Sequence, residues 1–577
     1  MQIKGTELFV KALIAEGVDT LFAYPGGQVI PIFDALYQQD AIDVILPRHE
    51  QALVHAADGY ARSTGKVGVC LVTSGPGATN AVTGIATANF DSVPLVCFTG
   101  QVPTKLIGND AFQEVDIAGI TRGITKYNTV IRDRADVARV IKEAFYIART
   151  GKPGVVLVDL PVDVMNALGD DTYPDEVNIR SYKPVSSVHM GQLKRAVALL
   201  NEARRPVILA GGGVKLSGAG PALTELMEQT HIPVATTLMG KGVVPSSSPY
   251  SLGFMGMHGY FAANMAINDC DLLFSIGTRF NDRITGDVKR FAPHAKIIHI
   301  DIDAASISRN IQVDIPIVAD AKRAILAMKE MVEPQDMTPW NDEINAWRAQ
   351  HPMTMGSAHT GLTPQCIIET VNTVLPDSIV VTDVGQHQMW AAQYTAMSPE
   401  RQFLTSGGLG TMGFGLPAAI GAQIGNRDKA VVCFSGDGGM QMNSQELATA
   451  VCQEANVITI VFNNSYLGMV RQWQELFWDK HYSGTCLRRR RSCQHICADP
   501  SAACPPYTPD FVKLAESYGA LGLRVFAPEE LIPALEQAKA ANTPAVIECI
   551  LEPEVNVYPM VPGGKALNEM ILEGMDK

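Results

Sequence analysis

The sequence has 577 residues, of which 47% are hydrophobic and 18% charged, and its formal net charge is −13. This length exceeds what one hydrophobic core usually supports, and the apolar content excludes extensive disorder, so we expect about three globular domains. The negative charge disfavours nucleic acids and anionic membranes as partners and favours small molecules.

The N-terminal segment predicts an amphipathic helix that runs directly into a strand. It lacks the charged start, apolar centre and cleavage site of a signal peptide, so we expect no export. No uncharged apolar run reaches the roughly 18 residues that a membrane-spanning helix needs. The eleven cysteines are an odd number and mostly stand singly in apolar stretches, which indicates a reducing compartment. We therefore expect a cytoplasmic protein.

Two segments far apart in the chain share one pattern. Residues 67–100 and 430–464 each give a short apolar run, a glycine-rich turn, a helical stretch and a second apolar run. This length suits a strand, a crossover helix and a parallel strand. A third α/β region lies between them, with strand-to-turn junctions at 205–214, 271–280 and 296–303.

The repeated pattern predicts an α/β fold of three doubly wound parallel-sheet domains. Helices rich in small residues, 55–65 and 413–425, precede the two repeats and suit close helix packing. We place the domains at 1–168, 188–332 and 360–577, and the linkers in the polar stretches 169–187 and 333–361.

A single carboxylate, Asp437, stands among glycines at the end of an apolar run, in the sequence SGDGG. In an open parallel sheet such a turn lies where ligands bind and lets backbone N–H groups approach a phosphate. The stretch 431–470 contains no lysine or arginine, so two negative groups would meet unless a cation came with the ligand. The next predicted strand ends at Asn463 and Asn464, whose amide oxygens suit Mg²⁺. The pattern therefore predicts a magnesium diphosphate site. The structural alternative is that Asp437 caps a helix near Asn443 or pairs with a distant lysine.

This spacing, GDG followed by 24 residues and then NN, resembles the signature of thiamin diphosphate enzymes. The first repeat carries GPGATN (75–80) without an acidic residue, so we expect it to serve the other end of the cofactor. Glu50 is predicted at a strand end and in the first turn of a helix, where these enzymes place a glutamate that bonds N1′ of the aminopyrimidine. As an alternative, Glu50 only stabilises the helix dipole, by about 0.3–1 kcal/mol.

Ordered motifs along nearly the whole chain are similar to those of the acetohydroxyacid synthase (acetolactate synthase) family, in its catalytic large subunit. They are YPGG (24–27), RHEQ (48–51), TSGPGATN (73–80), DAFQEVD (110–116), GMHG (256–259), DVGQHQMW (383–390), SGGLGTMGFGLPAA (406–419) and LGMVRQWQ (467–474).

The resemblance implies a thiamin diphosphate site shared by the two outer domains. It assigns Mg²⁺ ligands at Asp437, Asn464 and the Tyr466 carbonyl. It also implies cofactor or active-site contacts for Gly27, Glu50, Phe112, Gln113, Gln386, His387, Gly410, Met412, Gly436, Gly438 and Met469. Without the resemblance, Phe112, Met412 and His387 would be interpreted as packing residues.

The central domain resembles the family's FAD-binding, Rossmann-like domain, in which the flavin is structural. The sequence GGGV after a predicted strand is shorter than a dinucleotide fingerprint, so this assignment rests on the resemblance. The implied FAD residues are Lys152, Gly211, Gly212, Gly213, His258, Gly277, Arg279, Asp301 and Asp320.

The implied reaction joins pyruvate, after loss of CO₂, to a second 2-oxo acid. Pyruvate as acceptor gives 2-acetolactate, and 2-oxobutyrate gives 2-aceto-2-hydroxybutyrate, both in branched-chain amino acid biosynthesis. Trp473 is expected to favour the larger acceptor and Arg279 to meet its carboxylate. Because Glu50 and Asp437 lie on separate domains that hold opposite ends of one cofactor, the family implies a homodimer or tetramer. A small regulatory subunit is left open as a further partner.

The sequence departs from the family at Lys152, where relatives usually carry an arginine that contacts FAD, and at Val162, where many have lysine. A stretch of about twenty residues near 485–508 is inserted; it holds four cysteines, His495 and the run Arg488–Arg491. We interpret it as a solvated loop, with a basic interaction loop, a zinc site or an out-of-frame stretch as alternatives.

Two other functions stay open at this point. Pyruvate oxidase and the 2-oxo acid decarboxylases are thiamin diphosphate enzymes with the same three-domain build. A relative that binds nucleotides without catalysis belongs to a different class.

Overall fold

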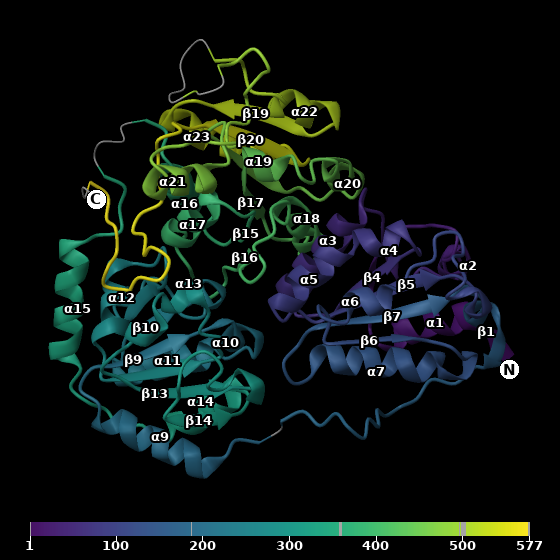
Figure 1. The fold of residues 1–577 in the computed structure, drawn as a ribbon, viewed down its shortest axis with the longest axis horizontal. Coiled ribbons are helices and arrows are strands. Elements are labelled where there is room, and N and C mark those ends of the chain that lie inside the picture. The colour runs from purple at the N-terminus through teal and green to yellow at the C-terminus, as the bar shows by residue number, and fades with distance from the viewer. Residues whose placement is uncertain (1, 186, 357–360, 495–496, 498–503, 575–577) are drawn as a thin grey trace.

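The computed structural model describes residues 2–185, 187–356, 361–494, 497 and 504–574. Over these residues the chain builds three six-stranded parallel sheets and one two-stranded antiparallel pair (Figure 1). Successive residues of one strand enter different hydrophobic clusters, as Cys70 and Leu71 do in the first sheet. Because strand side chains alternate between faces, both faces of each sheet are buried, and the predicted doubly wound α/β fold is confirmed.

The first sheet lies near the N-terminus. Its strands are β2 (Thr20–Ala23), β3 (Asp43–Ile45), β4 (Gly68–Val72), β5 (Leu95–Gln101), β6 (Tyr127–Val130) and β7 (Val155–Pro161), and β1 (Gln2–Lys4) pairs with β8 (Leu168–Asp170). The helices are α1 (Gly5–Ala15), α2 (Ile30–Tyr37), α3 (Glu50–Thr64), α4 (Pro76–Asn80), α5 (Val82–Phe90), α6 (Ile117–Thr121), α7 (Val137–Arg149) and α8 (Val162–Asn166).

The middle sheet follows after residue 188. Its strands are β9 (Pro206–Ala210), β10 (Val234–Thr236), β11 (Ser251–Phe254), β12 (Leu272–Ile276), β13 (Lys296–Asp301) and β14 (Ile315–Val318). The helices are α9 (Met190–Glu202), α10 (Gly212–Leu216), α11 (Gly220–Thr230), α12 (Phe261–Asp269), α13 (Asp282–Thr285), α14 (Ala321–Lys329) and α15 (Thr338–Gln350).

The third sheet belongs to the C-terminal part. Its strands are β15 (Ile379–Thr382), β16 (Phe403–Thr405), β17 (Val431–Gly436), β18 (Ile458–Asn463), β19 (Leu521–Val525) and β20 (Ala545–Ile550). The helices are α16 (Pro364–Val374), α17 (Gln386–Tyr394), α18 (Gly415–Gly425), α19 (Asp437–Met440), α20 (Glu446–Cys452), α21 (Gly468–Phe477), α22 (Phe511–Ser517) and α23 (Leu531–Ala540).

The first and third sheets share one topology. Their strand orders are β3-β2-β4-β5-β7-β6 and β16-β15-β17-β18-β20-β19. In both sheets the strand that is second in the sequence (β3, β16) forms one edge, and the strand that is second to last (β6, β19) forms the other. The two predicted repeats, β4 to β5 and β17 to β18, are neighbouring parallel strands in each. The middle sheet has the order β11-β10-β9-β12-β13-β14, which is the dinucleotide-binding order with its switch point between β9 and β12.

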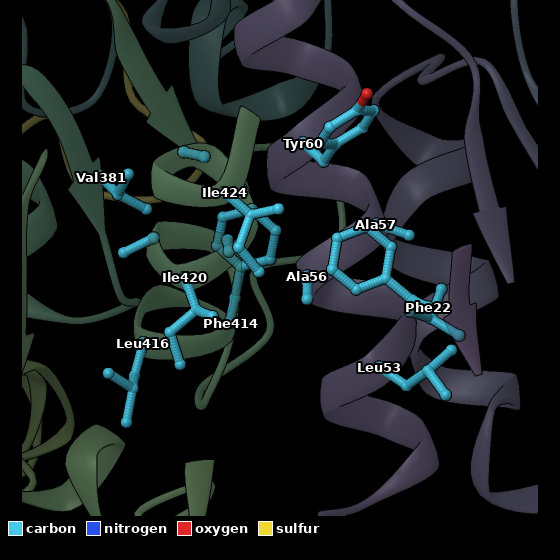
Figure 2. Close-up of a cluster of buried hydrophobic side chains, with 14 of the residues drawn as sticks. Phe22, Leu53, Ala56, Ala57, Tyr60, Val381, Phe414, Leu416, Ile420 and Ile424 are labelled. Atoms are coloured by element: carbon cyan, nitrogen blue, oxygen red, sulfur yellow. The ribbon is translucent and has the colours of Figure 1, made fainter. Parts of the chain in front are cut away.

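The first and third domains meet through the two helices rich in small residues, α3 and α18. A methyl group built on Gly421 would lie 1.8 Å from the Ala56 carbonyl oxygen, and one built on Gly59 would lie 2.0 Å from that of Ala418. Figure 2 shows Ile424 of α18 pointing toward α3, and Ile420 belongs to the same buried cluster. The backbones therefore pack in direct contact, and one buried cluster continues from the first sheet to the third.

One predicted linker is wrong. The stretch 333–361 contains α15, whose Trp340 and Ile344 are buried against the middle domain. Trp340 donates its indole N–H to the Pro206 carbonyl, at 3.2 Å. This polar helix buries only Trp340 and Ile344 and packs a third apolar residue, Trp347, partly buried beside them, so its apolar stripe is narrow. The domain boundaries themselves stay predictions. Among the described residues, no helix combines the length and apolar character needed to cross a membrane.

Replacing Gly421 with alanine tests the contact between the helices. In an exposed helix this change gains stability, by up to about 1 kcal/mol. Here the added methyl group overlaps backbone, so we expect the free energy of unfolding to fall by about 1–3 kcal/mol in urea titrations. The control is Gly123→Ala, because no atom lies within 4 Å of a methyl group built there. Equal stability of the two variants would contradict the packing described.

Candidate functional site

The ends of β15, β17 and β18 form a small cavity at the switch point of the third sheet. Its volume is about 70 Å³, and its lining includes Gln386, His387, Asp437, Asn464 and Tyr466. Met412, Met469, Gly436 and Gly438 also line it. The structure thus brings together these predicted residues, which are up to 83 positions apart in the sequence, Gln386 and Met469, as the parallel arrangement predicted.

Asp437 is buried and incompletely paired. Its side chain is 2% exposed, and Oδ1 accepts a hydrogen bond from the Gly438 N–H at 2.9 Å. Oδ2 has no hydrogen-bond partner, and burial raises the pKa of the carboxyl to about 8. The helix near Asn443 begins at Glu446, and Asp437 lies in α19 instead, so the capping alternative is wrong. An ionised carboxylate that is buried without full pairing is unfavourable, and a bound cation would stabilise it.

The groups beside Asp437 are held in fixed orientations. Asn464 donates its Nδ2 to Gln386 Oε1 at 3.2 Å, while its Oδ1 accepts from the Tyr466 N–H at 3.1 Å. Burial lowers the pKa of His387 to about 3, so this imidazole is neutral, and its Nε2 has no partner. A side chain on Gly436 would overlap the His387 ring. The site therefore offers neutral donors and acceptors around one carboxylate.

A second, larger cavity of about 1310 Å³ lies at the switch point of the middle sheet and reaches both outer domains. Among the residues proposed for FAD, those lining it are Lys152, Gly212, Gly213, His258, Gly277, Arg279, Asp301 and Asp320. Gly211 does not line the cavity, because it packs closely against Gly277. A methyl group built on Gly211 would lie 2.1 Å from the Gly277 carbonyl oxygen. The turns after β9 and β12 thus pack backbone against backbone.

Charged groups around the larger cavity are partly desolvated. Burial raises the pKa of Asp301 to about 6 and lowers that of His258 to about 4. Lys152 pairs with Asp303 at 3.2 Å, and Asp320 caps α14 by accepting from the Arg323 N–H. At the position where relatives are expected to carry an arginine, the cavity therefore presents Lys152, whose ammonium group is already paired with Asp303.

The two cavities share a wall. Met412 and Met469 line both, while Gly410, Arg279 and Trp473 line the larger one. Trp473 leaves its indole Nε1 without a hydrogen-bond partner in the interior. A ligand bound at Asp437 would therefore extend toward Trp473 and Arg279.

The remaining predicted residues form a separate group on the first domain. Glu50 accepts from Asn80 Nδ2 at 3.0 Å and lies close to Gly77, and Gln113 packs beside Gly75. Phe112 is 86% exposed, and a methyl group built on Gly27 would meet open space. None of Gly27, Glu50, Phe112 and Gln113 lines either cavity. Within one chain the two halves of the predicted site are apart, and the Glu50 half is open.

Three family models match the chain in order. The thiamine pyrophosphate enzyme N-terminal TPP binding domain matches residues 3–120, the central domain 193–328 and the C-terminal TPP binding domain 383–549.

Relatives match over nearly the full length. The chain is 47% identical to a probable acetolactate synthase large subunit of Methanocaldococcus jannaschii, over 99% of this chain and 95% of the relative. It is 42% identical to the acetolactate synthase isozyme 3 large subunit of Escherichia coli K12, over 100% and 99%. The Corynebacterium glutamicum large subunit is 44% identical, over 99% and 90%. The chain belongs to the acetolactate synthase large-subunit family.

Sequence reasoning missed a buried ion network between the domains. Arg62 pairs with Asp58 and, at 3.0 Å, with Asp91, whose carboxylate also accepts from the Gly407 N–H. Arg279 lies 3.7 Å from the other Asp91 oxygen. The network thus links α3 to the wall of the larger cavity. The sequence did contain a signal for this network. Asp58 and Arg62 are opposite charges four residues apart in a helix of small residues, which places them side by side on the helix.

The insert near 485–508 begins as ordered structure. Leu467 donates its N–H to the Thr485 carbonyl and Leu487 donates to that of Ser465, both at 2.9 Å. Gln441 donates to the Tyr507 hydroxyl at 2.6 Å. His495, the histidine that the zinc alternative would add to the four cysteines, lies outside the described residues. A freely solvated loop is therefore the wrong description for both ends of the insert.

Two aspartates at the same sheet edge give opposite predictions for the protein without cofactor. We expect Asp437→Asn to raise the free energy of unfolding by about 1–3 kcal/mol, because it removes an incompletely paired buried carboxylate. Asp383 is equally buried but accepts from the backbone N–H groups of Val384, Gly413 and Gly415, so Asp383→Asn should destabilise. Urea titrations at pH 7 compare them. Destabilisation by both changes would show that Asp437 is not under electrostatic strain.

Proposed function

We propose that this chain is the catalytic subunit that converts two pyruvates into 2-acetolactate and CO₂. With 2-oxobutyrate as acceptor it forms 2-aceto-2-hydroxybutyrate, in branched-chain amino acid biosynthesis. The observation that carries the proposal is the unpaired Asp437 oxygen beside Asn464, at the switch point of a sheet that matches a TPP binding domain. A metal diphosphate supplies the charge that this carboxylate lacks.

The residues present fit thiamin diphosphate with Mg²⁺. Asp437, Asn464 and the Tyr466 carbonyl would hold the cation, since all are hard oxygen donors around one small cavity. Gln386, His387, Gly436 and Gly438 would lie along the diphosphate, where side chains would block its approach to the backbone at the glycines. Bound thiamin diphosphate supplies a carbon nucleophile and an electron sink for decarboxylation.

The proton chemistry is assigned to Glu50, which would hold the proton at N1′ of the aminopyrimidine. Met412 would support the bend of the cofactor, beside Gly410 and Met469. Because the Glu50 group lines neither cavity of its own chain, we assign it to the site of a second copy, with Gly27, Phe112 and Gln113. The functional unit is then a homodimer or a tetramer. The name large subunit, which the relatives carry, supports a small regulatory subunit as a further partner.

FAD is assigned to the larger cavity in a structural role. Its support is the strand order of the middle sheet, the volume of about 1310 Å³ at the switch point, and the two glycine turns there. Lys152 would meet a phosphate as a single point charge, whereas arginine would offer a two-pronged donor. The flavin would take no part in the net redox balance, because the proposed reaction has none.

The choice of acceptor is assigned to Trp473 and Arg279, which face the larger cavity next to the shared wall. Trp473 packs against Met257, Leu476 and Met560, so its ring is fixed in place. A flat apolar surface favours the ethyl group of 2-oxobutyrate over the methyl group of pyruvate.

An assay of acetolactate formation, with thiamin diphosphate, Mg²⁺ and FAD each omitted in turn, tests the reaction. We expect no product without thiamin diphosphate or Mg²⁺, and reduced product without FAD. Acetaldehyde or acetyl phosphate from pyruvate, in place of acetolactate, would overturn the proposal in favour of a decarboxylase or an oxidase. Failure to bind thiamin diphosphate in calorimetry would favour a non-catalytic relative.

Trp473→Leu tests the acceptor assignment in a competition between pyruvate and 2-oxobutyrate. We expect acetolactate formation to continue while preference for 2-oxobutyrate falls about tenfold or more, because the flat surface is lost. Trp478→Leu is the matched control, since Trp478 follows the same helix but is 67% exposed and lines neither cavity. An unchanged product ratio in the Trp473 variant would rule out this role.

A further inference from the structure

The loop that follows β18 carries two of the proposed cation ligands in a strained conformation. Ser465 has a φ of 66°, in the left-handed region that residues with a side chain rarely adopt. Asn464 and Tyr466, the residues on either side of this turn, both line the same cavity. A conformation of this kind persists only where surrounding groups hold it.

The first support comes from the start of the insert. The residue pair Tyr466 and Cys486 is bridged by hydrogen bonds on either side, from Leu467 N–H to Thr485 and from Leu487 N–H to Ser465. In this antiparallel pattern the paired residues themselves do not exchange hydrogen bonds. The Tyr466 carbonyl is therefore not used by the ladder, while its neighbours on both sides are fixed.

The second support is a buried carboxylate. Glu548 is 3% exposed, and its Oε1 accepts from Asn463 Nδ2 at 2.6 Å. An ionised carboxylate only accepts hydrogen bonds, so it orients the Asn463 amide with NH₂ toward Glu548 and oxygen toward the loop. That oxygen accepts from the Ser465 N–H at 3.0 Å. Glu548 thus acts on the left-handed residue through one intervening side chain.

Glu548 is in turn held by an ion pair. Arg524 donates its Nε to Glu548 Oε2 at 2.7 Å and reaches Asp510 with Nη2. Asp510 follows the insert and accepts from the N–H groups of Val512 and Lys513 at the start of α22. Both ends of the inserted region are therefore connected to the loop after β18, one through the backbone and one through Arg524 and Glu548.

We propose that Glu548 is a positioning residue for the cation site. It fixes Asn463, and through it Ser465, so that Asn464 and the Tyr466 carbonyl meet the cation together. Glu548 does not line the cavity, so it acts without touching the cation. The inference rests on the proposed Mg²⁺ site and adds a residue that no motif in the chain indicates.

Mn²⁺ binding to the full-length protein, followed by electron paramagnetic resonance with saturating thiamin diphosphate, tests this. Glutamine at 548 can turn its NH₂ toward Asn463, which reverses the Asn463 amide and removes the acceptor for Ser465. We expect Glu548→Gln to weaken Mn²⁺ binding about 10- to 100-fold. The Mg²⁺ concentration for half-maximal turnover should rise in parallel, with turnover recovering at excess Mg²⁺. The matched control is Glu530→Gln, since Glu530 accepts only from backbone N–H groups of its own turn.

A second substitution separates positioning from general damage. Asn463→Asp alone sets two carboxylates against each other and should also weaken Mn²⁺ binding. Combining it with Glu548→Gln restores one donor facing one acceptor and leaves an oxygen for Ser465, so binding should recover above either single variant. Mn²⁺ affinity of Glu548→Gln within about twofold of the parent, or no recovery in the double variant, overturns the inference. A parent protein that does not bind Mn²⁺ removes the proposed cation site itself.

Discussion

The direct backbone contact between α3 and α18 is the constraint on which the rest of the structure depends. Gly59 and Gly421 allow an approach that one added methyl group would prevent, and a single apolar cluster then spans two sheets. Glu446 strengthens this contact by accepting from the Arg48 N–H at 3.0 Å, two residues before Glu50. The first and third domains of one chain are therefore rigidly joined. This rigidity sets where α3 begins, and so where Glu50 lies.

The two halves of the proposed cofactor site, one around Asp437 and one around Glu50, are the unfavourable parts of this structure. The Asp437 half has a buried carboxylate oxygen without a partner, and the Glu50 half exposes Phe112 almost fully. Neither is a stable surface for an isolated, empty chain. Both become reasonable if a cation and diphosphate fill the first and a second copy covers the other. Stability is thus given up where a cofactor and a partner subunit are expected to restore it.

Much of this could be predicted from the sequence, because the informative residues are local. Asp437 and Asn464 follow two consecutive strands of one crossover unit, and such strands end at the same sheet edge. The glycines in the segments that form α3 and α18 likewise predicted close helix packing. The strand orders could not be predicted, because apolar runs do not specify which neighbour each strand takes.

The connections that carry the new inference were also beyond sequence reasoning. Asn463 and Glu548 are 85 residues apart and meet only because β18 and β20 are neighbours. The insert shows no periodicity that would predict pairing with the loop after β18. Likewise α15 was missed because only two of its side chains, Trp340 and Ile344, are buried. In each case tertiary contacts, and not local preference, determine the structure.

The central claim, that one copy completes the site of another, is tested most directly by mixing two inactive variants. Glu50→Gln and Asp437→Asn are unfolded together, refolded together and assayed for acetolactate. If each site takes Glu50 from one copy and Asp437 from the other, half of the dimers contain one intact site, and activity returns to about a quarter of the parent level. If each chain builds its own site, mixing restores nothing, and the account is wrong.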